Sequence, residues 1–248
     1  MPDATGYRIK FGAIVPSTNT VVEADYNRMA PHGVTFHTGR MYIENPVMDS
    51  DASFEALLVQ IRGSIRVAIR DVMTCKPDAL IMGMSSETFW GGVKGNAEFI
   101  ERVKVQSGLS ISTGASACRA ALERHGSRRI AVLSPYQPIS DRQVTRYFEE
   151  AGFTVVRFKG LRCPTATSIA EVPEAQLLPI IRDELNGSDV DAIIQVGTNL
   201  SMVRLADEAE RWLGKPVLAI NAVTLWHALR TNGILDQMRG CGSLLREH

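Results

Sequence analysis

The sequence lacks the features that would assign the protein to a membrane, a secretory route or a nucleic acid. No run approaches the roughly 18 apolar residues of a membrane-spanning helix, and residues 1–10 contain no apolar signal-peptide core. Lys+Arg and Asp+Glu are equal at 27 each, so no basic surface for nucleic acid or anionic lipid is indicated. We therefore expect a cytoplasmic protein that binds neither nucleic acid nor a membrane.

Cysteines are few, and the glycines form no nucleotide-binding motif. The four cysteines, Cys75, Cys118, Cys163 and Cys241, have no spacing typical of metal ligands, and in a cytosolic chain they are expected to be reduced thiols. No G-x-G-x-x-G follows the first apolar run, and no P-loop is present. We expect neither a metal nor a cofactor, so acid–base chemistry would fall to side chains alone.

The chain does contain a regular alternation of short apolar runs with longer amphipathic segments. Its 248 residues, 45% of them hydrophobic, suffice for a sizeable core. The runs are typical of parallel strands buried on both faces, and they cover residues 9–15, 34–37, 79–82, 109–112, 130–134, 154–158, 192–196 and 217–220. The helix-like segments cover residues 20–29, 53–74, 96–107, 115–125, 139–151, 174–185, 202–213 and 223–232. This alternation predicts a doubly wound α/β fold.

An internal repeat divides the chain into two similar parts. The octapeptide DALIMGMS, which begins at Asp78, recurs as DAIIQVGT from Asp191, and similar strand-to-helix steps follow at Gly108 and Gly214. The repeat predicts two pseudosymmetric, doubly wound parallel-sheet halves with an active site in the cleft between them. The expected boundaries give residues 1–114 with 222–248 in the first half and residues 115–221 in the second.

The repeat also places polar residues at equivalent strand ends. In parallel sheets, ligands bind at the carboxyl ends of the strands. Those ends are Met84-Ser85-Ser86 in one half and Gly197-Thr198-Asn199 in the other, and a loop and a helix follow each of them. Loop amides and helix N-termini at such places favour a carboxylate or a phosphate.

Short motifs along nearly the whole chain resemble those of one enzyme group. Residues 14–20 (IVPSTNT) resemble the first-strand loop of maleate cis–trans isomerases. Residues 134–136 (SPY) and 196–199 (VGTN) resemble the same group and its relative arylmalonate decarboxylase, and residues 240–245 (GCGSLL) are similar too. The order and spacing of these motifs carry the resemblance, which implies the aspartate/glutamate racemase-like fold.

The resemblance implies a pocket that grips a substrate carboxylate and stabilises an enediolate-type anion without a cofactor. The implied dioxyanion hole consists of Ser85, Ser86, Tyr136 and backbone amides near Gly197 and Thr198. Asn19 matches a substrate-contacting asparagine of the isomerases, and Asn199 joins it as an expected substrate-binding residue.

One departure from the family pattern changes the expected chemistry. Racemases and maleate isomerases carry a cysteine at each pseudosymmetric strand end, and arylmalonate decarboxylase keeps the second. The corresponding positions hold Met84 and Gly197 here, so neither offers a thiol. Glu87 is the nearest ionisable residue, and we predict that it takes over proton transfer; alternatively, it is a capping or solvent-exposed glutamate. Cys163 is the competing thiol, reaching in from a loop.

The other candidate residues have structural alternatives as well. Ser85 and Ser86 suit a helix N-cap or a turn as well as a substrate contact, and Asn19 is a common turn residue. Tyr136 can donate to an oxyanion or can be an amphipathic tyrosine at a surface.

The sequence therefore predicts an enzyme that acts on a small carboxylate or dicarboxylate through an enediolate-type anion. We favour a decarboxylase-like reaction, because the isomerase chemistry needs the missing thiol. The alternatives are an isomerase that uses a non-standard residue and a non-catalytic carboxylate-binding protein. Symmetric association is common among soluble enzymes, so a homo-oligomer remains open.

Overall fold

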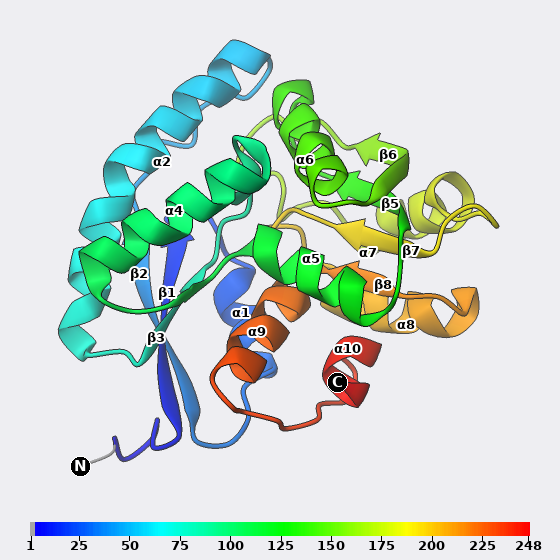
Figure 1. Ribbon diagram of the computed structural model, residues 1–248. Coiled ribbons are helices and arrows are strands. Elements are labelled where there is room, and N and C mark those ends of the chain that lie inside the picture. Colours follow the sequence, from blue (N-terminus) through cyan, green and yellow to red (C-terminus); the bar gives the residue numbers. More distant parts are fainter. Residues whose placement is uncertain (1–2) are drawn as a thin grey trace.

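The strands form two separate parallel sheets, each with four strands (Figure 1). The computed structural model describes residues 3–248. The first sheet has the order β2 (Val34–Met41), β1 (Ile9–Pro16), β3 (Ala79–Met82) and β4 (Ile111–Ser112). The second has the order β6 (Thr154–Gly160), β5 (Arg129–Ser134), β7 (Ala192–Gln195) and β8 (Val217–Ala219). The two orders are the same apart from numbering, which confirms the predicted pair of pseudosymmetric parallel-sheet halves.

Helices cover both faces of the sheets, as the doubly wound arrangement requires. In the first half, α2 packs on β1 and β2, while α1 packs on β2 and α9 on β3 and β4. The helices are α1 (Val22–Arg28), α2 (Asp51–Val72), α3 (Ser86–Phe89), α4 (Gly92–Ser107), α5 (Gly114–Arg124), α6 (Pro138–Glu150), α7 (Glu174–Pro179), α8 (Val203–Leu213), α9 (Ile220–Thr231) and α10 (Ser243–Glu247). Short 3₁₀ and π turns extend α2 and α7 at Met73–Cys75 and Ile180–Leu185.

The first residue of the repeat has the same structural role in both halves. The Asp78 carboxylate accepts a hydrogen bond of 2.7 Å from the Lys10 N–H, and the Asp191 carboxylate accepts one of 2.7 Å from the Arg129 N–H. Each aspartate thereby joins the start of its own strand to the start of the central strand beside it. The repeat marks this shared junction.

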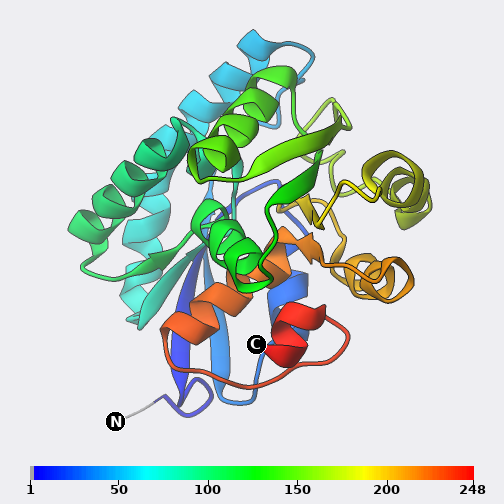
Figure 2. The ribbon, with the colours of Figure 1, turned by 45° about the vertical axis from the view of Figure 1, so that its right-hand side comes forward.

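The connection between the halves runs through α5 and α9, which lie side by side between the two sheets (Figure 2). Helix α9 follows β8 of the second sheet and then packs on α1, β3 and β4 of the first. The boundaries at residues 114 and 221 remain a prediction. Within the described chain, residues 3–248, no helix combines the length and apolarity that a membrane crossing would need.

Several element boundaries differ from expectation, and one helix was not expected at all. Ile220 begins α9 instead of ending a strand, and α4 begins at Gly92 instead of residue 96. Gly91 and Gly92 have φ angles of +78° and +68°, which glycine adopts without strain, and they allow the sharp turn from α3 into α4. The single-turn helix α3 was expected to be a polar loop, because it is too short to show a helical period.

Candidate active site

Residues from both halves enclose a small cavity at the carboxyl ends of the strands. Its volume is about 50 Å³, which accommodates a few water molecules. The polar lining consists of Thr18, Asn19, Ser86, Tyr136, Thr198 and Asn199. The apolar lining consists of Pro16, Ile43, Met48, Phe54, Leu57, Ile61, Met84, Ala166 and Ile169. Five residues that the sequence predicts for the site therefore meet in one place: Asn19, Ser86, Tyr136, Thr198 and Asn199.

Asn19 is both a cap and a cavity residue. Its Oδ1 accepts hydrogen bonds of 3.0 Å from the N–H groups of Val21 and Val22, which begin α1. This orients the amide so that Nδ2 lies 3.4 Å from the Thr198 hydroxyl, across the junction between the halves. The structural and the functional interpretations of Asn19 are thus compatible, because each uses a different end of the amide.

Tyr136 and Ser85 form a buried pair of hydroxyls. The Ser85 Oγ lies 2.6 Å from the Tyr136 hydroxyl and donates to the Val196 carbonyl at 2.5 Å. Because Ser85 has one proton and gives it to Val196, Tyr136 is the donor to Ser85. Burial raises the pKa of Tyr136, against the opposing effects of the Ser85 hydroxyl and the Ser86 N–H. Tyr136 is therefore neutral, and its one proton goes to Ser85, which lies behind it and outside the cavity lining, so Tyr136 donates to a ligand only in exchange for that bond.

Ser86 and Asn199 line the cavity from equivalent strand ends. The Ser86 hydroxyl donates to the Met84 sulfur at 3.2 Å, a weak acceptor from which a carboxylate can take over the proton. The Asn199 side chain accepts from the Thr20 N–H at 3.0 Å and donates to the Ala166 carbonyl at 2.8 Å. Asn199 thereby holds the first loop against the second half.

Gly197, predicted to supply a binding amide, is not in the cavity lining. Its carbonyl accepts from the Gln195 side chain at 2.5 Å and from the Leu200 N–H at 3.0 Å. These two bonds tighten the turn after β7 and present Thr198 and Asn199 to the cavity.

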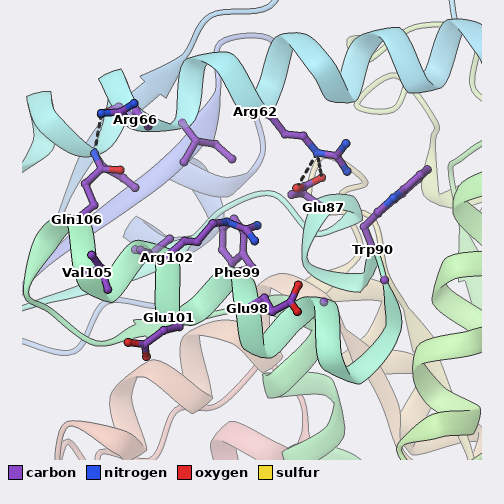
Figure 3. A pocket seen from close by; sticks show the side chains of 15 residues that line it. Arg62, Arg66, Glu87, Trp90, Glu98, Phe99, Glu101, Arg102, Val105 and Gln106 are labelled. Carbon is purple, nitrogen blue, oxygen red and sulfur yellow. Dashed lines mark hydrogen bonds and ion pairs between the residues drawn. The ribbon is translucent and has the colours of Figure 1, made fainter.

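The Glu87 carboxylate faces a different hollow. Both of its oxygens accept from the Arg62 Nε, at 2.8 and 2.9 Å, although the side chain is only 6% exposed. It lines a groove of about 1130 Å³ between α2 and α4, where Arg62 also lies over the Trp90 ring (Figure 3). Glu87 would have to leave Arg62 to reach the cavity, so its catalytic role remains a prediction.

The segment between β2 and α2 closes the cavity from the first half. The Met48 N–H donates to the Pro164 carbonyl at 2.6 Å, and the Met48 carbonyl accepts from the Gln137 side chain at 2.5 Å. Asn45 adds a bond of 3.0 Å to the Thr167 hydroxyl. These three bonds join the segment to the second half at the edge of the cavity.

The apolar lining is the part of the site that the sequence did not reveal. Phe54, Leu57 and Ile61 project into the cavity from α2 at spacings of three and four residues. The same spacing marks any helix face that packs on a core, so these residues could not be distinguished from core residues. Ile169 comes from an irregular segment of the second half and has no periodic signal.

A protein-family model described as arylmalonate decarboxylase matches residues 11–245 of this chain. The chain belongs to this family. The maleate isomerase of Pseudomonas putida is 26% identical over 96% of this chain and 97% of its own length. The arylmalonate decarboxylase of Bordetella bronchiseptica is 24% identical over 90% of each chain. A Nocardia farcinica maleate cis–trans isomerase variant has the same fold, with a TM-score of 0.85, 24% identity, and coverage of 97% of this chain and 99% of that one. The predicted resemblance is confirmed, and these relatives are isomerases or lyases.

Family membership directs attention to thiols, because the Nocardia structure holds a covalently bound succinylcysteine intermediate. No cysteine is among the residues that line the cavity described here. Cys163 is buried, and burial raises the pKa of its thiol to about 11. Tyr136 is the one ionisable side chain in the lining. That Met84 and Gly197 occupy the family's two thiol positions remains a prediction from the repeat.

Metal ligands do not gather at this site. Among residues 3–248, no group of three or more histidine, cysteine, aspartate or glutamate side chains lies close enough together to hold a metal ion. The cavity lining itself offers hydroxyls and amides for hydrogen bonding, together with apolar side chains.

Proposed function

We propose that this member of the arylmalonate decarboxylase family is a cofactor-independent, cytoplasmic enzyme that acts on a small carboxylate and stabilises an enediolate-type anion in the cavity between its halves. Decarboxylation is the favoured reaction. The observation that carries the proposal is a cavity lining in which neutral polar side chains, those of Asn19, Ser86, Tyr136 and Thr198, lie among apolar ones and no lining residue is a cation.

The polar side chains of the lining suit the carboxylate that remains in the product. When the bond from the α-carbon to the departing carboxyl breaks, its electron pair stays on the α-carbon and spreads into the remaining carboxylate. Neutral donors aimed at those oxygens stabilise this anion, and each such donor typically lowers the barrier by about 2.7–4 kcal/mol. Ser86 and the amide of Asn19 are placed to supply such donors.

The apolar side chains of the lining suit the carboxyl group that leaves. Burial of a charge without a partner is costly, and the cost disappears when the group departs as neutral CO₂. Phe54, Leu57 and Ile61 offer no hydrogen bond to a carboxylate. A second carboxylate at this place is therefore destabilised in the ground state. The reaction removes the cost of burying its charge.

The proton that completes the product comes from Tyr136 or Glu87. Tyr136 lines the cavity, whereas Glu87, the donor predicted from the sequence, is paired with Arg62 outside it. Proximity comes before acidity in the choice of a proton donor, so we assign the step to Tyr136 and keep Glu87 as the competing donor.

The experiment offers the purified protein phenylmalonate, methylmalonate and maleate, with and without EDTA, and follows the products by proton NMR. Release of CO₂ and formation of a monocarboxylate, unaffected by EDTA, support the proposal. The Tyr136→Phe variant should lose turnover, whereas Tyr147→Phe, a matched change at a buried tyrosine on α6, should retain it.

Two other outcomes would replace the proposal. Formation of fumarate from maleate without CO₂ would make the protein an isomerase, an activity that the Pseudomonas putida relative's name suggests. Thermal stabilisation by these acids without any product would make it a carboxylate-binding protein.

A further inference from the structure

A buried amide on α9 holds the backbone of the second strand end. Asn221 is 2% exposed, and its Nδ2 donates both to the Thr198 carbonyl at 2.9 Å and to the Asp25 carboxylate at 2.8 Å. A carbonyl and an ionised carboxylate only accept hydrogen bonds, so the amide nitrogen must face them. The Asn221 amide therefore has one orientation.

The direction of the Thr198 carbonyl sets the direction of the next N–H. In a trans peptide the C=O and the following N–H point in opposite directions. Because the Thr198 carbonyl points to Asn221 on α9, the Asn199 N–H points away from α9. It has no hydrogen-bond acceptor within residues 3–248, and Asn199 lines the cavity.

The first half holds its own strand end with different residues. The repeat and the strand register align Ser85 with Thr198 and Ala115 with Asn221. The Ser85 carbonyl accepts from the Thr88 hydroxyl at 2.7 Å, and the oxygen of that hydroxyl accepts from the Ala115 N–H at 3.3 Å. The Ser85 carbonyl also accepts from the Thr88 and Phe89 N–H groups of α3, at 2.8 and 3.3 Å, so the helix after β4 reaches it only through the Thr88 hydroxyl, whereas α9 bonds the Thr198 carbonyl directly.

The N–H groups that follow the two aligned carbonyls are those of Ser86 and Asn199. The Ser86 N–H follows the Ser85 carbonyl, and its effect on Tyr136 opposes the rise that burial causes in the pKa of that phenol. The Asn199 N–H occupies the equivalent place in the second half and has no protein partner there. The two N–H groups occupy equivalent positions at the two strand ends, and no protein acceptor among residues 3–248 bonds the Asn199 N–H.

We propose that Asp25 and Asn221 are positioning residues, which hold the Thr198 carbonyl so that the Asn199 N–H serves as an anion donor for a bound carboxylate. The inference rests on the proposed function, since it names a donor of that same site. Neither Asp25 nor Asn221 lines the cavity, so both act through the Thr198–Asn199 peptide.

Asp25 has the properties that this role requires. It is 3% exposed on α1, and beyond Asn221 it contacts Arg28 at 2.9 Å. Burial raises the pKa of Asp25, while the Asn221 amide and Arg28 oppose that rise. The Asn221 Oδ1 is buried without a partner among the described residues. A buried oxygen without a hydrogen bond is costly. The fold accepts this cost at Oδ1 and keeps the two hydrogen bonds that Nδ2 donates.

The test compares Asn221→Leu, Asp25→Asn and a matched control. Leucine has nearly the shape of asparagine without its hydrogen bonds, and Asp25→Asn keeps an acceptor for Asn221. The control is Asn96→Leu, because Asn96 is also buried and makes two side-chain bonds, to Ser116 and Thr113, away from the cavity. Malonate is the probe, with its Kd measured by calorimetry and the Asn199 N–H followed by nitrogen-15 NMR.

In the wild type, malonate should shift the Asn199 N–H resonance. In Asn221→Leu the affinity should fall about ten- to hundredfold, the effect of one hydrogen bond to a charged ligand, and the shift should disappear. The Kd of Asp25→Asn for malonate should stay within a few-fold of the wild-type value. The Kd of Asn96→Leu should do so as well, at a loss of Tm comparable to that of Asn221→Leu. Equal losses of affinity in Asn221→Leu and Asn96→Leu would overturn the inference.

Crystal structures of the wild type and Asn221→Leu separate this inference from the proposed function. Absence of malonate binding in the wild type would count against the carboxylate site as a whole. The direction of the Thr198 carbonyl can still be observed without a ligand. Rotation of that peptide in Asn221→Leu supports the positioning role, and an unchanged carbonyl overturns it. If Asn221→Leu does not fold, the same comparison is made with Asp25→Leu.

Discussion

Substitution of Gly197 by cysteine tests whether the second strand end has room for the thiol that the family pattern would place there. A Cβ at Gly197 would lie 2.3 Å from the Pro135 Cγ and 2.6 Å from its Cδ. Carbon atoms in favourable contact are about 3.5–4.0 Å apart. The proline ring is rigid and directly follows β5, so the strand end itself must move. Overpacking of this kind typically costs about 1–3 kcal/mol, and we expect Gly197→Cys to be destabilised by about that amount.

The matched control is Gly63→Ala, where the opposite sign is expected. Gly63 lies inside α2, and an added Cβ meets no atom within 4 Å. Alanine is more favourable than glycine in a helix interior by about 0.8–1.0 kcal/mol, so this variant should be more stable than the wild type. The assay is urea unfolding followed by circular dichroism, with the midpoint compared at constant m-value.

If Gly197→Cys unfolds at the same urea concentration as the wild type, the reasoning is refuted, because the position then has room for a side chain. Met84→Cys provides the comparison at the first strand end. Met84 lines the cavity, so this substitution places a thiol in the site without a clash.

The remaining predictions concern the candidate residues and pH. Tyr136→Phe should lower turnover by about 10²–10³-fold but change the free energy of unfolding by only about 0.5–1.5 kcal/mol, because Ser85 keeps its bond to Val196; equal activity would remove Tyr136 from the mechanism. Glu87→Gln should retain most turnover, and a loss as large as that of Tyr136→Phe would restore Glu87 as the proton donor. Iodoacetamide should not inactivate the enzyme, because burial raises the Cys163 pKa to about 11; inactivation that substrate prevents and Cys163→Ser abolishes would show a thiol mechanism. Burial lowers the pKa of His227 below 6.5, so the unfolded chain binds the proton more readily and stability should fall as pH falls below 6.5; urea midpoints of wild type and His227→Gln that run parallel from pH 8 to 5 would contradict this.

The repeat could be predicted from the sequence because its causes are local. Asp78 and Asp191 each begin a buried strand and bond the backbone of the neighbouring strand at the same distance. Such a junction needs the same residue type in the same register, so it leaves a pattern in the sequence. The strand ends that follow, and with them Ser86, Thr198 and Asn199, were found from that pattern.

The direction of individual side chains could not be predicted in the same way. Ser86 and Glu87 are neighbours, but they lie in α3, where successive residues point about 100° apart. One therefore lines the cavity and the other the groove between α2 and α4. The contact between Asp25 and Asn221 joins residues 196 positions apart, and it depends on the return of α9 to the first sheet.

A crystal structure of the wild-type protein with malonate tests the central claim most directly. The account predicts malonate in the cavity between the halves, with one carboxylate in contact with the Asn19 Nδ2, the Tyr136 hydroxyl and the Asn199 N–H, and the other against Phe54 and Leu57. Malonate bound instead in the groove between α2 and α4, or an empty cavity at saturating malonate, would contradict it.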